Sequence, residues 1–235
     1  MTAENIKNQL LAFGNPSKAT HATYFFKTGK GQYGEGDRFI GCTVPESRGV
    51  AKKFMHTPLT ELEKLLDDEM HECRLCALSI LVAQFHKADE TKQRELVDFY
   101  LAHTHRINNW DLVDLSCYHI VGAWLKDKEE RSLLYSLAKS DSLWEQRIAM
   151  VSTMAFIRNN DFADTLKLCE LFLTHKHDLM HKACGWMLRE AGKRNEEVLT
   201  AFLDSHYPVM PRTMLRYAIE RLSPEQKSNY MKRTV

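Results

Sequence analysis

Residues 26–39, FKTGKGQYGEGDRF, carry Gly29, Gly31 and Gly34 in the spacing G-x-G-x-x-G, which can hold nucleotide phosphates. Such a loop must follow a β-strand and open a helix, because the phosphate sits on backbone amides at the helix start. Here residues 16–28 have a helical pattern and no strand follows. We therefore expect a glycine-rich turn between helices. The polar residues interleaved in 29–38 leave contact with a ligand or a partner open; they are Lys30, Tyr33 and Arg38.

Metal binding is a second chemistry that the residues suggest. Cys73 and Cys76 form a C-x-x-C motif without a second pair of ligands, and His103 and His105 lie two apart without a third ligand. The other cysteines lie mostly in apolar helical segments, as small hydrophobic residues of a reducing compartment do. We expect no metal and no cofactor.

The strongest candidates for chemistry are aromatic and charged side chains on helical segments. Trp110 and Asp114 are four residues apart and share one helical face. Asp114 lies inside the apolar run LVDLSCYHIVGAWL, where a carboxylate costs free energy unless it is paired or functional. The structural alternative is an ion pair with Arg147 of a neighbouring repeat, and tryptophans on helices are more often core residues. Later candidates are Trp144, Arg147, Lys182, Trp186, Arg189, Lys193 and Arg194.

The elements that position these residues are helices. Apolar residues follow helical periodicity nearly throughout the chain. A capping residue precedes proline at Asn15-Pro16, Thr57-Pro58 and Ser223-Pro224, which is typical of helix starts. Short and long segments alternate, and the long ones cover residues 70–85, 109–125, 142–157, 177–192 and 210–222.

The long segments repeat with a period near 36 residues. Arg74 and Arg147 are 73 residues apart, or two periods, and Lys182 follows Arg147 by 35. This predicts an all-α solenoid of HEAT-like helix pairs whose second helices line a concave groove. We expect a single domain over residues 1–235, in which 1–56 form N-terminal helices around the glycine-rich loop and 57–235 form the stacked pairs.

Composition and charge narrow the class of protein. The chain of 235 residues is 44% hydrophobic and 27% charged, with no apolar stretch long enough to span a bilayer and no signal-peptide pattern at the start. We expect a cytoplasmic protein that does not bind membranes. Residues 1–60 hold 8 Lys and Arg against 4 Asp and Glu, and residues 181–235 hold 10 against 6, so both ends are basic. Basic ends fit an acidic polymer as a partner, or a solvated surface without one.

Three segments together resemble a known family. NNWDLVDLS, LWEQRIAMVSTMAFIR and HKACGWMLREAGKR are similar to the AlkD group of bacterial DNA alkylation repair proteins, which are alkylpurine DNA glycosylases built from HEAT-like repeats. The likeness extends from NPSKA to PRTMLRYAIERL, almost the whole chain. One departure is Asn109, where some relatives carry a second tryptophan.

The resemblance implies a role for each matched residue. Trp110 and Trp186 would line a cleft against the damaged nucleotide, and Asp114 would stabilise the cationic sugar or position the attacking water. The damaged base, a cationic N3- or N7-alkylated purine of duplex DNA, would not need to leave the duplex for a pocket. The expected partner is duplex DNA, bound by a monomer through the phosphate backbone. The implied backbone contacts are Arg147, Lys182, Arg189, Lys193, Arg194, Arg212 and Arg216.

Two alternatives remain open from the sequence. A non-catalytic DNA-binding solenoid that prefers damaged or branched DNA would bind in a salt-dependent way and release no base. A protein-binding scaffold would have no affinity for DNA. The near-neutral net charge of +1 favours the scaffold, whereas Asp114 among tryptophans and arginines favours the two DNA-binding hypotheses.

Overall fold

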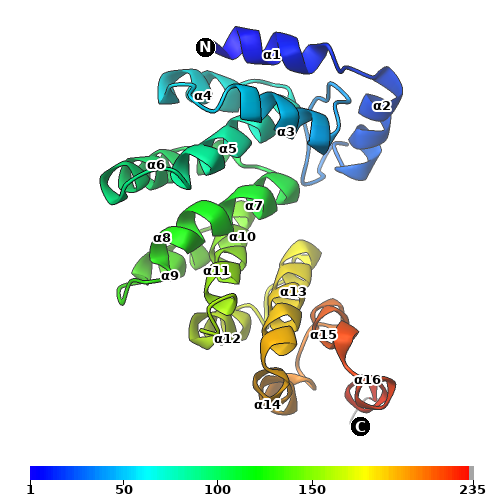
Figure 1. Cartoon of the computed structure of the whole chain (residues 1–235). Coiled ribbons are helices and arrows are strands. Elements are labelled where there is room, and N and C mark those ends of the chain that lie inside the picture. Colours follow the sequence, from blue (N-terminus) through cyan, green and yellow to red (C-terminus); the bar gives the residue numbers. More distant parts are fainter. Residues whose placement is uncertain (233–235) are drawn as a thin grey trace. The chain divides into compact units, whose positions relative to one another are not determined.

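The computed structural model describes residues 1–232, and these form helices joined by short connections without a β-strand (Figure 1). The predicted all-α class is thereby confirmed. Contacts divide the chain into two compact units, Met1–Ile120 and Val121–Val235. Each unit is described by itself, and a single continuous domain stays a prediction. None of the helices in the described part of the chain is both long and apolar enough to cross a membrane.

Unit 1 is built around one long helix. Its helices are α1 (Ala3–Leu11), α2 (Pro16–Phe25), α3 (Val44–Lys53), α4 (Leu59–Leu66), α5 (His71–Phe85), α6 (Glu90–Ala102) and α7 (Trp110–Cys117). α3 and α4 both pack on α5, and α7 packs on its other side. Because α5 is covered by several helices, most of its residues are buried. α3, α5 and α7 thus lie in succession as one layer of unit 1.

Unit 2 repeats this packing. Its helices are α8 (Ala123–Leu125), α9 (Ser132–Ala138), α10 (Leu143–Ser152), α11 (Met154–Ile157), α12 (Ala163–Leu171), α13 (Asp178–Arg194), α14 (Glu196–His206), α15 (Arg212–Ala218) and α16 (Pro224–Met231). α9 packs on α10, and α12 packs on α13. α10, α13 and α15 also contact one another in succession. Contacts between every second helix are those expected of stacked helix pairs.

The helix starts agree closely with the sequence. Asn15 and Ser223 are N-caps whose side chains accept hydrogen bonds from the backbone N–H of the third helical residue. The third predicted start differs by one residue, because Pro58 is the N-cap of α4 and the Thr57 hydroxyl instead donates to the carbonyl of Phe54. Shifts of this size are usual at helix ends.

The segment predicted as one helix over 109–125 is interrupted. α7 ends at Cys117, and a π-helical turn over Tyr118–Gly122 leads into α8. Gly122 marks a close approach within unit 2, since a Cβ there would lie 2.3 Å from the carbonyl oxygen of Ser152. Gly185, which directly precedes Trp186, is explained in the same way: a Cβ would lie 2.4 Å from the backbone oxygen of Met214 on α15. Both glycines allow neighbouring helices to pack at backbone distance.

The cysteines behave as small core residues. All six are free thiols, five are buried, and Cys42 is half-buried. Burial raises the pKa of the Cys76 thiol to about 12, and it also raises the pKa values of Cys42, Cys73 and Cys169. The predicted burial in helical segments is confirmed.

Candidate functional site

α7 presents one side to the core and one side outward. Its core side consists of residues with no exposed surface, namely Leu112, Val113, Ser116 and Cys117. Trp110, the first residue of the helix, and Asp114, one turn later, are both half-buried on the other side. The structure therefore places this predicted pair together on the outward side of α7.

The start of α7 is fixed by Asn109, which has no exposed surface. Asn109 is the N-cap of α7, and its side-chain oxygen accepts a hydrogen bond from the backbone N–H of Trp110, the first residue of the helix, at 2.9 Å. Its side-chain amide donates to Asp37 at 3.4 Å. The residue that departs from the family pattern thus caps the helix that carries Trp110.

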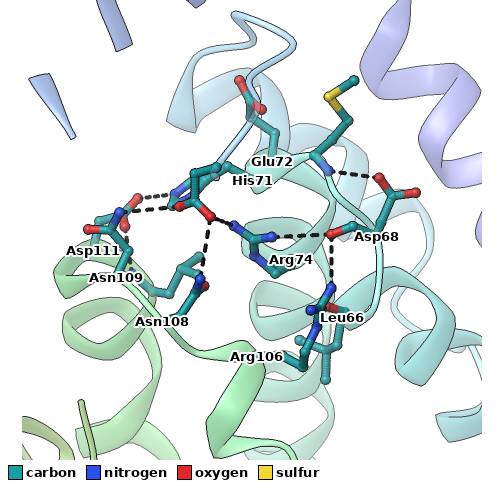
Figure 2. Close-up of polar contacts among 12 residues, drawn as sticks. Leu66, Asp68, His71, Glu72, Arg74, Arg106, Asn108, Asn109 and Asp111 are labelled. Atoms are coloured by element: carbon teal, nitrogen blue, oxygen red, sulfur yellow. Dashed lines mark hydrogen bonds and ion pairs between the residues drawn. The ribbon is translucent and has the colours of Figure 1, made fainter. Parts of the chain in front are cut away.

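Asp37 lies at the centre of a buried polar network that joins the glycine-rich loop to two helices. Figure 2 shows His71, Arg74, Asn109 and Asp111 of this network. One Asp37 oxygen accepts from the Arg74 guanidinium at 2.6 Å, and the other lies 3.1 Å from Nδ1 of His71. Nε2 of the same imidazole lies 2.7 Å from an Asp111 carboxylate oxygen. The network connects the loop, the first turn of α5 and the first turn of α7.

The charges in this network support one another. Burial alone lowers the pKa of His71, but the charge of Asp111 and hydrogen bonds to Asp111 and Asp37 outweigh it and raise the pKa to about 9. Burial opposes ionisation of Asp37 as well, yet the bond from His71 and the Arg74 charge keep its pKa below the usual value. His71 is therefore a buried imidazolium at neutral pH, and both ring nitrogens donate to carboxylates.

An aromatic cluster surrounds the same imidazole. Phe26 stacks on Trp110 with ring centroids 5.5 Å apart and contacts His71 at 5.0 Å, and Phe39 stacks on Phe26 at 5.2 Å. Phe25 meets Trp110 edge to face. Trp110 is consequently held on one side by residues that flank the glycine-rich loop.

The glycine-rich loop serves this packing. Gly34 is buried, and a Cβ there would lie 2.4 Å from the carbonyl oxygen of Phe26. Gly36 has a φ of 85°, in the left-handed region that favours glycine. The helix α2 precedes the loop, so the expectation of a glycine-rich turn between helices is confirmed. The loop supports the start of α7.

Asp114 lies close to a buried tyrosine. The Tyr100 hydroxyl is 3.0 Å from the hydroxyl of Ser116, and the ring has no exposed surface. Burial raises the pKa of Tyr100, and the nearby charge of Asp114 adds to the rise. A carboxylate at the edge of the core meets low dielectric on one side, which strengthens its field. Its pairing with Arg147 stays a prediction.

In unit 2, Arg147 is only 4% exposed, and its guanidinium donates to the carbonyl oxygen of Leu179 at 2.6 Å. Arg74, two periods earlier, is 3% exposed and donates to the carbonyl oxygen of Asp68 at 3.2 Å. Arginines at corresponding repeat positions thus both hold backbone of a neighbouring segment. The predicted phosphate contact of Arg147 stays a prediction.

Trp186 lies in a pocket of about 470 Å³ on unit 2. Lys193 and Arg194 line this pocket as well, so three of the predicted residues come together here. Arg158 adds a further cation, and Glu190 is the acidic residue among those that line the pocket. The remaining wall is apolar, from Met154 and Ile157.

The other predicted cations are mostly engaged within unit 2. Lys182 forms an ion pair with Asp178 at 2.8 Å, and Arg189 forms one with Glu220. Arg212 donates to the carbonyl oxygen of Met231 at 3.2 Å. Arg216 is exposed on α15, and Trp144 is half-buried on α10. Trp110 and Asp114 lie in unit 1 and the others in unit 2, so their meeting in one recess stays a prediction.

The histidines that suggested a metal have other contacts. Nδ1 of His103 lies 2.7 Å from the carbonyl oxygen of Phe99, and its ring stacks on that of His105. Residues 1–232 hold no group of three or more His, Cys, Asp or Glu side chains placed to bind a metal ion.

Comparison with known proteins gives the family. A family model described as DNA alkylation repair enzyme matches residues 6–222. The chain belongs to this family. A solved structure of a predicted DNA alkylation repair enzyme from Enterococcus faecalis has a similar fold, with a TM-score of 0.70 and 16% identity over 90% of this chain and 97% of the other. No curated protein sequence matches the chain.

Sequence reasoning missed the buried network around Asp37. Asp37, His71 and Asp111 were missed because their contacts join segments more than 30 residues apart. One signal was present in the sequence. Arg74 and Arg147 occupy corresponding repeat positions, so both could have been expected to be buried and to need a hydrogen-bond acceptor. The chain around Asp37 offered no periodicity from which that partner could be inferred.

Proposed function

We propose that this member of the DNA alkylation repair family is a monofunctional DNA glycosylase, which hydrolyses the N-glycosidic bond of cationic N3- or N7-alkylated purines in duplex DNA. The observation that carries the proposal is the pair of Trp110 and Asp114 on the outward side of α7, behind a buried network that fixes the start of that helix. A rigid support of this kind is what a reacting group needs.

The chemistry suits a carboxylate and aromatic rings. An alkylated purine already carries positive charge, so it leaves with the electrons of the C–N bond as a neutral base and needs little acid catalysis. The sugar becomes an oxocarbenium cation, which Asp114 stabilises and to which water adds at C1′ with loss of a proton. The faces of Trp110 and Trp186 also attract cationic charge.

Duplex DNA is held through its phosphates in this proposal. The pocket around Trp186 combines an indole with cations of Arg158, Lys193 and Arg194. Such a surface binds backbone without reading base sequence, and its affinity falls as salt rises. Lys182, Arg189, Arg212 and Arg216 would add to the rim.

The proposal is tested by incubating the protein with duplex DNA that contains N7-methylguanine and measuring free base. The wild type releases base, and Asp114→Asn lowers the single-turnover rate by roughly 100-fold or more while DNA affinity stays within about twofold. Asp98→Asn, which removes an exposed carboxylate of α6, is the matched control and leaves the rate unchanged. Absence of base release by the wild type would refute the glycosylase.

A non-catalytic DNA-binding function is the second candidate, and the packing of Trp110 favours it, because Phe25 and Phe26 already cover part of the ring that the damaged nucleotide would contact. This candidate predicts salt-dependent binding to damaged or branched DNA without base release. The protein-binding scaffold predicts no DNA binding even at low salt.

A further inference from the structure

A second basic pocket lies on unit 1 and is formed in part by α7, the helix that carries Trp110 and Asp114. It has a volume of about 450 Å³ and is lined by α3, α5 and α7 together with Met55, His86 and His119, which lie just beyond the ends of these helices. Its polar lining is Arg48, Lys52, Ser79, His86 and His119. No carboxylate lines it, in contrast to the Trp186 pocket, where Glu190 is present.

Two cations from α3 line this pocket. Arg48 and Lys52 are four residues apart and share one face of the helix. Both are exposed, and neither forms an ion pair within residues 1–232. Lys182, Arg189 and Lys193 are by contrast all ion-paired. The positive charge at this pocket is therefore left for a ligand.

The opposite wall adds hydrogen-bond donors. Nε2 of His86 and Nδ1 of His119 lie 3.1 Å apart. A hydrogen bond between two imidazoles needs one nitrogen with a proton and one without, and the accepting ring then carries its N–H on its other nitrogen. The pair therefore carries one further N–H in either tautomer, on the ring that accepts the hydrogen bond. Cations with N–H donors and no acidic neighbour are the chemistry of a phosphate site.

The position of the pocket relates it to the proposed reaction. Leu115 and His119 line it, and Leu115 directly follows Asp114. From Asp114 to His119 the chain advances about 7 Å along the helix axis. Each DNA strand carries a phosphate about every 3.4 Å along the duplex axis. A strand that places its sugar at Asp114 thus brings a nearby phosphate within reach of the pocket.

We propose that the pocket formed by Arg48, Lys52, His86 and His119 is a phosphodiester-binding site that holds the DNA backbone beside Asp114. This inference rests on the proposed function for the identity of the ligand, DNA. The charge and geometry of the pocket do not depend on whether the protein cleaves a glycosidic bond. The contact reads neither base sequence nor damage, so it contributes equally to binding of intact and alkylated duplexes.

The test compares Lys52→Gln with Lys53→Gln in the full chain. Lys53 is the next residue of α3, is exposed and does not line the pocket, so it is a matched control. We expect Lys52→Gln to weaken binding of a labelled duplex roughly three- to tenfold, with or without N7-methylguanine, and to reduce the salt slope by about one. Arg48→Gln should act in the same direction. Equal effects of Lys52→Gln and Lys53→Gln would overturn the site.

A second arm separates the two sources of phosphate. Inorganic phosphate is titrated while the ring resonances of His86 and His119 are followed by NMR, with and without duplex. We expect the duplex to displace any bound phosphate. Saturable phosphate binding that duplex does not compete away would assign the pocket to a free anion and overturn the backbone site.

Base release distinguishes this inference from the proposed function. If the wild type releases no base but Lys52→Gln still weakens duplex binding selectively, the glycosylase fails and the phosphate site stands. If base is released while Lys52→Gln and Lys53→Gln bind alike, the phosphate site fails and the glycosylase stands.

Discussion

His71 holds Asp111 through a 2.7 Å contact between Nε2 and a carboxylate oxygen, and this contact joins the first turn of α5 to the first turn of α7. Asp111 directly follows Trp110 in the sequence, and its carboxylate contacts the buried imidazolium of His71. His71 thereby helps to fix the start of α7, the helix that carries Trp110 and Asp114.

The stability of unit 1 should decrease on the alkaline side. The pKa of His71 is raised from 6.5 to about 9, so its contribution is complete below pH 6.5 and is lost as pH rises through 9. The full loss is on the order of 3 kcal/mol. Urea unfolding across this range measures it, and His71→Gln should remove this part of the pH dependence. A wild type and variant with parallel profiles would contradict the assignment.

Loss of the Asp37 carboxylate should be far more costly than loss of an exposed one. Asp37→Asn leaves the charges of His71 and Arg74 buried without their shared counterion. We expect a decrease in the free energy of unfolding of about 3–5 kcal/mol. Asp98→Asn, which breaks an exposed pair with Arg94, should cost about 0.2–1 kcal/mol. Chemical denaturation of both variants checks the contrast, and similar losses would speak against a buried network.

Two glycine substitutions should have opposite signs. Gly185→Ala places a Cβ 2.4 Å from the backbone oxygen of Met214, so α13 and α15 must separate and the protein loses about 1–3 kcal/mol of stability. Gly49→Ala adds a Cβ in open space within α3 and should gain about 0.5–1 kcal/mol, since alanine restricts the unfolded chain. Thermal unfolding measures both. A tolerated Gly185→Ala would mean that the two helices are not in close contact.

Removal of an acid near Trp186 should tighten DNA binding. Glu190 pairs with Lys193 at 2.7 Å, so Glu190→Gln releases this cation and removes the acidic residue of the pocket. We expect duplex affinity to rise roughly two- to fivefold at low salt, with a steeper salt dependence. Glu129→Gln, at an exposed position elsewhere on unit 2, is the control and should have little effect in the same anisotropy titration. An unchanged affinity would show that DNA does not contact this pocket.

The helices and their repeat were readable from the sequence because they rest on local rules. Asn15 and Ser223 indicate helix starts because their side chains are typical N-caps, and the apolar residues of each helix recur with helical periodicity. The buried network that fixes the start of α7 could not be predicted from local patterns. Asp37 reaches His71 across 34 residues and Asn109 across 72, and nothing in the local pattern at Asp37 reports a contact at that distance.

The candidate site was predictable only in part for a similar reason. The spacing of Trp110 and Asp114 predicts their common side of α7, and the segment HKACGWMLREAGKR places Trp186 near Lys193 and Arg194. Whether a given cation is available is a different matter, because it depends on packing. Arg147 donates to backbone, whereas Arg48 on α3 has no ion pair within residues 1–232.

The thiols of this chain have a consequence for the conditions in which such a protein works. Methylating agents attack sulfur chiefly as thiolate, and a thiol whose pKa is raised stays protonated at neutral pH. Burial raises the pKa of Cys42, Cys73, Cys76 and Cys169, and Cys117 and Cys184 are enclosed in the core. In a member of the DNA alkylation repair family, enclosed thiols that stay protonated offer little thiolate to alkylating agents, so alkylation of its cysteines should be slow.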